Sequence, residues 1–239
     1  MHARACRFIL VGIAWAVTPA AGWAQQPVMA PVASHSMKDH FAQAMSVHTI
    51  IVRGDMAALG PAARQWLAQI DRTPWPAAAA GSVDDMRRAA REVAAATSLG
   101  TAASAMARML AACGSCHRAT GVMPAPPPAP LHNLGGIVGH MLDHQRALTH
   151  MLEGLVVPST SLWRQGAESL RVAPLRDNRL PRDADTTALK AIEQQVHEVA
   201  ERAATAEAGD GRAAVYGELV ASCAGCHSLH VKVWGPTPR

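Results

Sequence analysis

The sequence has few bulky aromatic side chains, and it has no apolar run long enough to span a membrane. Its 239 residues include only two Phe and one Tyr, although hydrophobic residues make up 49% of the chain. Alanine supplies much of that apolar content, so a buried cofactor is one way to fill the core. There is no Gly-rich phosphate loop and no basic run interleaved with aromatic residues, which argues against nucleotide and nucleic-acid binding.

The N-terminal segment has the features of a secretory signal. Arg4 and Arg7 precede an apolar run over residues 8–17, and small residues follow up to Ala24. A run of about ten apolar residues is shorter than the roughly 20 that a membrane anchor needs. We therefore predict a signal peptide over residues 1–24, a periplasmic location and no membrane span in the mature chain. Loss of the two arginines lowers the formal net charge from +4 to +2, so the basic pI is no argument for nucleic acid.

Cysteine is scarce, and its spacing is informative. Of five cysteines, Cys6 lies in the predicted signal, and in an export compartment the other four would ordinarily form disulfides. They occur instead in two copies of the pattern C-x-x-C-H, namely Cys113-Gly114-Ser115-Cys116-His117 and Cys223-Ala224-Gly225-Cys226-His227. This pattern attaches haem: two thiols on one helical turn each bond a vinyl group of the porphyrin, and the adjacent imidazole ligates the iron.

Two other types of site share the C-x-x-C part of the motif. A thioredoxin-like redox pair needs a βαβ pattern, which the chain lacks, and a four-cysteine zinc site would have to join pairs 110 residues apart. We therefore predict two covalently bound haem c groups. The cofactor-binding residues are Cys113, Cys116, His117, Cys223, Cys226 and His227, with the two histidines as proximal iron ligands.

The chain is internally duplicated. Apolar residues at helical spacing precede both motifs at a constant offset of 110, with Met106, Met109 and Leu110 in one copy and Tyr216, Leu219 and Val220 in the other. This offset extends back across two helices, which we expect to be separated at Gly100 in the first copy and at residues 209–211 in the second. The front of each unit repeats at an offset of 104, where Met-Lys-Asp-His at 37–40 matches Met-Leu-Asp-His at 141–144.

The periodicity predicts an all-α protein of two tandem four-helix bundles. The expected helices are 35–53, 55–71, 82–99 and 101–119, then 132–154, 158–171, 185–208 and 211–230. Asp55 and the pair Pro158-Ser159 are expected to open the second helix of each bundle. The first haem-binding bundle covers residues 25–120, a Pro-rich linker 121–131 and the second haem-binding bundle 132–239, with a longer loop at 171–187.

With C-x-x-C-H near the end of each unit's last helix, both halves of the sequence resemble the cytochrome c-prime (class II) type of c-type cytochromes. Members of this family are four-helix bundles with the motif near the C-terminus of the fourth helix. The resemblance implies thioether attachment at Cys113, Cys116, Cys223 and Cys226, and proximal ligation by His117 and His227. Many members leave the sixth iron position open, with an apolar distal pocket.

The second axial ligand is predicted from bundle topology. In an up-down-up-down bundle the end of the fourth helix lies beside the start of the first, where His40 and His144 occupy equivalent positions. We predict that these two histidines ligate the irons. Met37, Met141 and His140 are the alternatives, and a methionine ligand would raise the reduction potential relative to histidine. No role is predicted for His35, His48, His132, His150 or His197.

Three functions fit these features. Electron transfer between unidentified redox partner proteins is favoured, because the chain shows no separate catalytic constellation and need not be an enzyme. Binding or sensing of NO or CO is an alternative if a sixth position is open or displaceable. The third is a dihaem enzyme or a haem subunit of an oxidoreductase.

Overall fold

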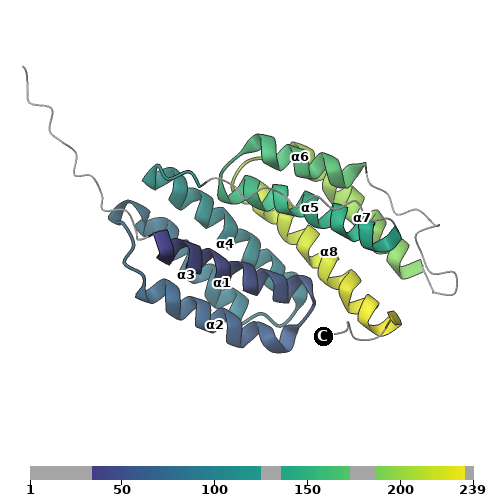
Figure 1. Ribbon diagram of the computed structural model, residues 1–239, viewed down its shortest axis with the longest axis horizontal. Helices are drawn as coiled ribbons and strands as arrows, with labels where there is room; N and C mark the ends of the chain where they lie inside the picture. The colour runs from purple at the N-terminus through teal and green to yellow at the C-terminus, as the bar shows by residue number, and fades with distance from the viewer. Residues whose placement is uncertain (1–33, 125–135, 173–186, 235–239) are drawn as a thin grey trace, which may run out of the picture. The chain divides into compact units, whose positions relative to one another are not determined.

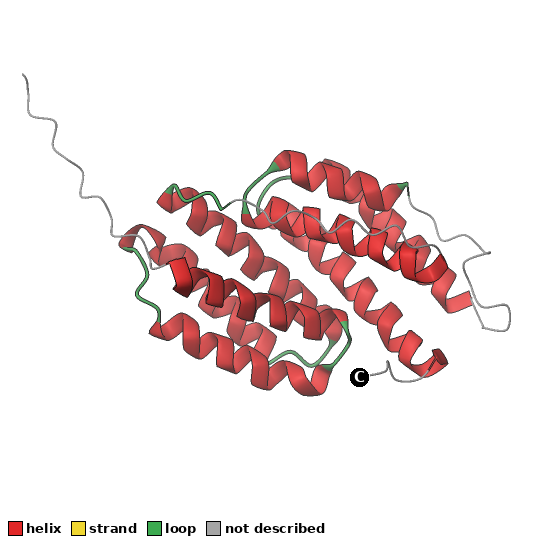
Figure 2. Cartoon of the chain, in the orientation of Figure 1, coloured by secondary structure: helices red, strands yellow, loops and turns green. Residues whose placement is uncertain are grey.

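The structure, a computed structural model, describes residues 34–124, 136–172 and 187–234 (Figure 1). Within these ranges the chain consists of α-helices, one short 3-10 helix and connecting turns, with no strand (Figure 2). The all-α prediction is therefore confirmed. The predicted signal peptide, most of the Pro-rich linker and nearly all of the loop at 171–187 lie outside the described residues.

The described α-helices follow one another in two sets of four. The first set is α1 (Ser34–Val52), α2 (Met56–Arg72), α3 (Ala80–Ala94) and α4 (Leu99–Thr120), with the 3-10 helix η1 (Ala77–Ala79) before α3. The second set is α5 (Gly136–Val156), α6 (Thr160–Arg171), α7 (Thr187–Thr205) and α8 (Asp210–Trp234).

Side-chain caps begin the second helix of each set, as the sequence predicts. Asp55 Oδ1 accepts a hydrogen bond of 3.1 Å from the backbone N–H of Ala58 at the start of α2. Ser159 Oγ accepts one of 3.3 Å from the N–H of Leu162 at the start of α6. Each cap satisfies a backbone donor that the first helical turn leaves unpaired, and such caps stabilise a helix by about 0.5–2 kcal/mol.

The predicted helix break at Gly100 is wrong. Helix α3 ends at Ala94, and α4 begins at Leu99, so that Gly100 lies inside the first turn of α4. The cause is a capping box: Ser98 Oγ accepts a hydrogen bond from the N–H of Thr101, and Thr101 Oγ1 accepts one from the N–H of Ser98. Two satisfied backbone donors outweigh the low helix propensity of one glycine in a first turn.

Consecutive helices pack against each other within each set, and α4 also lies along α8 (Figure 1). Buried apolar side chains from each of the described α-helices belong to one continuous cluster. Gly217 permits the close approach of α8 to α4, because a Cβ atom there would lie 2.9 Å from Ser104 Cα. The division into two domains at residues 121–131 remains a prediction. No described helix is long and apolar enough to cross a bilayer.

Candidate functional site

The first C-x-x-C-H motif occupies the last turns of α4. The helix ends at Thr120, where Gly121 adopts the left-handed conformation with a φ of 69°. Cys116 and His117 are buried and Cys113 is partly buried, with its Sγ 3.7 Å from the Sδ of Met109. Burial raises the pKa of the Cys113 thiol to about 12, so the thiol is neutral. No disulfide joins the cysteines of the described ranges.

The imidazole of His117 is held in one orientation by a backbone carbonyl. Its Nδ1 lies 2.7 Å from the carbonyl oxygen of Val156, the last residue of α5. Because a carbonyl oxygen only accepts, Nδ1 carries the proton that is donated, and in the neutral ring the lone pair is then on Nε2. A histidine that ligates a metal through Nε2 has this second contact as a rule.

The second motif lies in α8 and has a matching contact. The ring of His227 lies beside the backbone of Val52, the last residue of α1. Burial lowers the pKa of His227, and the Val52 backbone opposes the effect. Burial also raises the pKa of Cys223 to about 12. Each motif histidine is therefore oriented by the first helix of the opposite set, a pairing that sequence analysis did not predict.

His40 lies in an aromatic pocket near the first motif. It is 3% exposed, and its ring centroid is 5.7 Å from that of Trp66 and 5.1 Å from that of Trp75. Neither of its ring nitrogens has a hydrogen-bond partner among the described residues. Burial, and then the charge of the nearby His117, lower the pKa of His40 to about 4. The alternative ligand Met37 is less buried than His40.

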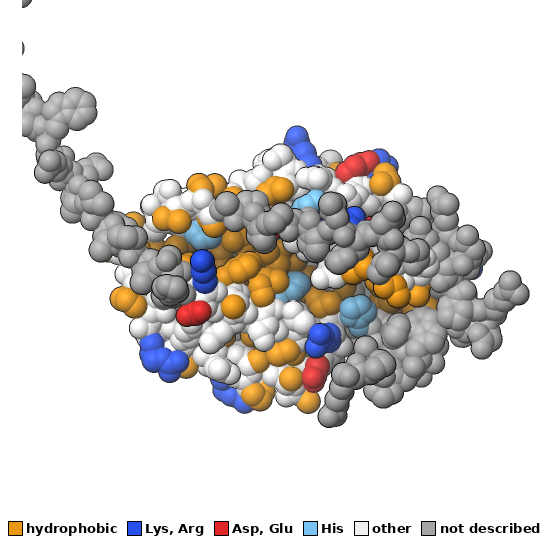
Figure 3. Space-filling view, in the orientation of Figure 1, with side chains coloured by type: hydrophobic (Ala, Val, Ile, Leu, Met, Phe, Trp, Pro, Cys, Tyr) orange, Lys and Arg blue, Asp and Glu red, His pale blue; other side chains and the backbone are white. Residues whose placement is uncertain are grey.

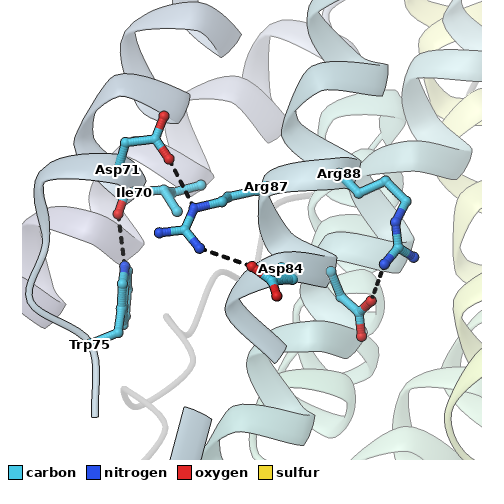
Figure 4. A network of polar contacts seen from close by, with 7 residues as sticks. Ile70, Asp71, Trp75, Asp84, Arg87 and Arg88 are labelled. Carbon is cyan, nitrogen blue, oxygen red and sulfur yellow. Dashed lines mark hydrogen bonds and ion pairs between the residues drawn. The ribbon is translucent and has the colours of Figure 1, made fainter. Parts of the chain in front are cut away.

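Trp75 is fixed against His40 by contacts at the junction of α2 and α3 (Figure 4). Its indole N–H donates a hydrogen bond of 2.7 Å to the carbonyl of Ile70. Arg87 on α3 bridges Asp71 on α2 at 2.9 Å and Asp84 on its own helix at 3.0 Å. Trp75 and Arg87 also line a hollow of about 250 Å³. The aromatic pocket is thus held from outside by polar contacts.

The equivalent place in the second set contains a polar cluster. His140 Nε2 lies 3.1 Å and His144 Nε2 3.6 Å from one carboxylate oxygen, Glu193 Oε1. His197, one turn further along α7, places its Nε2 3.1 Å from the same oxygen. The donor atoms of His140, His144 and Glu193 all lie within 4.8 Å of one another. We call these three residues the His-His-Glu cluster.

The carboxylate of the cluster is ionised although it is largely buried. Burial acts to raise the pKa of Glu193, but the nearby imidazoles of His140, His144 and His197 hold that pKa below its usual value. Burial raises the pKa of Cys226, and the charge of Glu193 raises it further. Glu193 therefore lies near the second motif. The alternative ligand Met141 is less buried than His144.

Figure 3 shows hydrophobic side chains gathered in the middle of one face, with histidine side chains beside them.

His48 on α1, for which the sequence predicts no role, is buried. Its Nε2 lies 3.0 Å from Tyr216 Oη on α8, and burial lowers the pKa of His48 to about 4. No sequence signal joins two residues 168 positions apart, so this contact was missed.

Comparison with protein-family models, with curated proteins and with solved structures finds no match for this chain. What the chain binds must therefore be argued from its own residues.

Proposed function

We propose that this chain is a dihaem c-type cytochrome of the cytochrome c-prime type, arranged as two tandem four-helix bundles, that transfers electrons between redox partner proteins in the periplasm. Haem c would be attached at Cys113 and Cys116 with His117 as iron ligand. The second haem would be attached in the same way at Cys223, Cys226 and His227.

The observation that carries the proposal is the orientation of the motif histidines. His117 uses Nδ1 for the Val156 carbonyl and keeps Nε2 for a metal, and the ring of His227 has the corresponding contact with Val52. A histidine that only filled space in a core would not need the same contact in both copies. The residues present therefore fit the group that the motif implies.

The surroundings of His40 support a sixth ligand for the first iron. An imidazole with both nitrogens buried and without a hydrogen-bond partner among the described residues is costly unless something binds it. The neighbour of His40 is the motif histidine His117, which lowers the pKa of His40 when the His117 ring is protonated. We therefore assign the distal position of the first iron to His40. His144 has the corresponding position in the second copy, where its neighbours differ.

Haem, when bound, supplies a one-electron iron couple. The chain fixes His117 through the Val156 carbonyl, places the Val52 backbone beside His227, and surrounds His40 with Trp66 and Trp75. This excludes water from the first site and limits the reorganisation that accompanies a change of charge.

Counting the haems tests attachment. The chain is expressed with a c-type maturation system, and haem per chain is measured from the pyridine haemochrome spectrum and the intact mass. Two covalent haems are expected in the wild type, one in the double variant Cys113→Ala/Cys116→Ala, and two in the matched control Ser115→Ala. A wild-type chain without covalent haem would refute the proposal.

Spectroscopy tests the distal ligand and separates electron transfer from gas binding. If His40 ligates the first iron, that iron is low-spin and unreactive toward CO, and His40→Ala makes it high-spin and CO-binding. The control Met37→Leu should change neither property. High-spin, CO-binding iron at the first motif of the wild type would instead support gas binding.

A further inference from the structure

We propose that the His-His-Glu cluster is a binding site for one divalent transition ion of the zinc type, distinct from the two haem-attachment motifs. His140 and His144 stand four residues apart on α5 and so project from one face of that helix. Glu193 faces them from α7. Two imidazoles and one carboxylate form a donor set that suits zinc and its neighbours in the first transition row.

The distances agree with the dimensions of such a site. Zinc binds histidine nitrogen and carboxylate oxygen at about 2.0–2.2 Å, so the donor atoms of a tetrahedral site lie about 3.3–3.5 Å apart. The nitrogens of His140 and His144 lie 3.1 and 3.6 Å from Glu193 Oε1. Two of the three donor pairs therefore have the spacing of a shared ion, and all three donors lie within 4.8 Å of one another.

Burial makes His140 costly without a ligand. His140 is 0% exposed, and neither of its ring nitrogens has a hydrogen-bond partner within the described part of the chain. The carboxylate of Glu193 beside it is 13% exposed. A bound divalent cation would give the buried imidazole a partner.

The fold itself does not require the cluster, because the first copy lacks it. At the established offsets, Ser36 corresponds to His140, Val83 to Glu193 and Arg87 to His197. Val83 is buried as an ordinary core residue. The polar residues are thus an added feature of the second copy rather than part of the repeated helix packing.

His197 acts as a positioning residue. Its Nε2 lies 3.1 Å from the carboxylate oxygen, but it stands outside the three donors that lie within 4.8 Å of one another. From there it fixes the carboxylate as an outer-sphere partner. Three protein ligands leave the fourth position of a tetrahedral ion to water or an exogenous ligand, the arrangement found in sites with an exchangeable position.

This inference assigns His144 to the divalent ion instead of the second haem iron. The first haem would then have His117 and His40, whereas the second would have His227 as its ligand from the described residues. The two haems would differ in spin state and in CO binding. Covalent attachment at the four cysteines does not depend on this assignment.

The test is zinc binding by the full-chain holoprotein, in which attached haem blocks the cysteine thiols. After dialysis against EDTA, zinc chloride is titrated by calorimetry, and bound zinc and iron are counted by mass spectrometry of the elements. One zinc per chain is expected in the wild type. Glu193→Gln and His140→Ala should each weaken binding by more than about 100-fold, and His197→Ala by about 10–100-fold.

Matched controls come from the same two helices. His150→Ala on α5 and Glu201→Gln on α7 remove one imidazole and one carboxylate outside the cluster, and should leave zinc affinity unchanged. Zinc should also raise the unfolding temperature of the wild type but not that of Glu193→Gln. This second readout on the wild type does not depend on how well a variant folds.

The outcomes separate this inference from the proposed function. A holoprotein with two covalent haems that binds no zinc overturns the inference and leaves the cytochrome proposal standing. Zinc binding that survives Glu193→Gln and His140→Ala also overturns it. A chain without covalent haem that binds one zinc, and loses it in those variants, supports the site while refuting the cytochrome proposal.

Discussion

The buried contact between His48 and Tyr216 predicts how the stability of the fold responds to acid. Burial holds the pKa of His48 at about 4, against 6.5 for an exposed histidine. As the pH falls below 6.5, the unfolded chain binds a proton on His48 while the folded chain stays neutral until about pH 4. The free energy of unfolding therefore falls between pH 6.5 and 4, and His48 does not affect it above 6.5. At about 1.36 kcal/mol per pH unit, the full loss is on the order of 3 kcal/mol.

The assay is guanidinium unfolding, followed by circular dichroism at pH 7 and pH 5. Between these two values His48 should account for about 2 kcal/mol of lost stability, which His48→Leu abolishes. Tyr216→Phe serves as the matched variant. It leaves a buried imidazole nitrogen unpaired, costing about 1–3 kcal/mol at pH 7, but retains the acid sensitivity. If His48→Leu loses as much stability as the wild type between pH 7 and 5, the argument from burial is wrong.

Three further predictions concern helix contacts, each measured as the free energy of unfolding in urea. Gly217→Val should cost about 1–3 kcal/mol by forcing α8 away from α4. At Gly100, no described atom lies within 4 Å of an added Cβ, so Gly100→Ala should instead stabilise the fold by up to about 1 kcal/mol. Equal effects of the two glycine variants would contradict the close-approach argument. Trp163→Phe should cost about 1–3 kcal/mol, because the indole N–H donates a buried hydrogen bond of 2.7 Å to the Ala203 carbonyl; an unchanged midpoint would show that this bond adds nothing. Ser98→Ala should cost about 0.5–2 kcal/mol through loss of the capping box, and no loss would mean that the cap does not determine where α4 begins.

Helix positions could be predicted because their signals are local. Asp55 and Ser159 cap helices where the sequence places them, since a cap involves only residues up to three positions away. The apolar stripe before the first motif is buried, as its helical spacing predicts. Phe41 lies on the apolar side of α1 by its helical spacing, but it is 37% exposed. Periodicity predicts which face of a helix is apolar, but not how far the neighbouring helices extend to cover it.

The contacts that define the sites could not be predicted, because they join helices that are distant in the sequence. The repeat marks Val52 and Val156 as equivalent, but nothing in the spacing indicates that each would orient the motif histidine of the other copy. No role is predicted for His197 from the sequence, yet its ring contacts Glu193. Such pairings depend on how helices cross, which is set by packing over the whole core.

The contacts between the motif histidines and the backbones of Val52 and Val156 resemble an isologous dimer interface. In both cases, the same pair of residues makes the contact in each direction. Between separate chains, such a contact would weaken on dilution. Here both copies belong to one polypeptide, so the contact forms intramolecularly, at an effective concentration that is typically millimolar for short flexible linkers. In a dimer of identical chains, every substitution appears in both subunits. The two copies within one chain can differ, as Glu193 in the second copy and Val83 in the first illustrate.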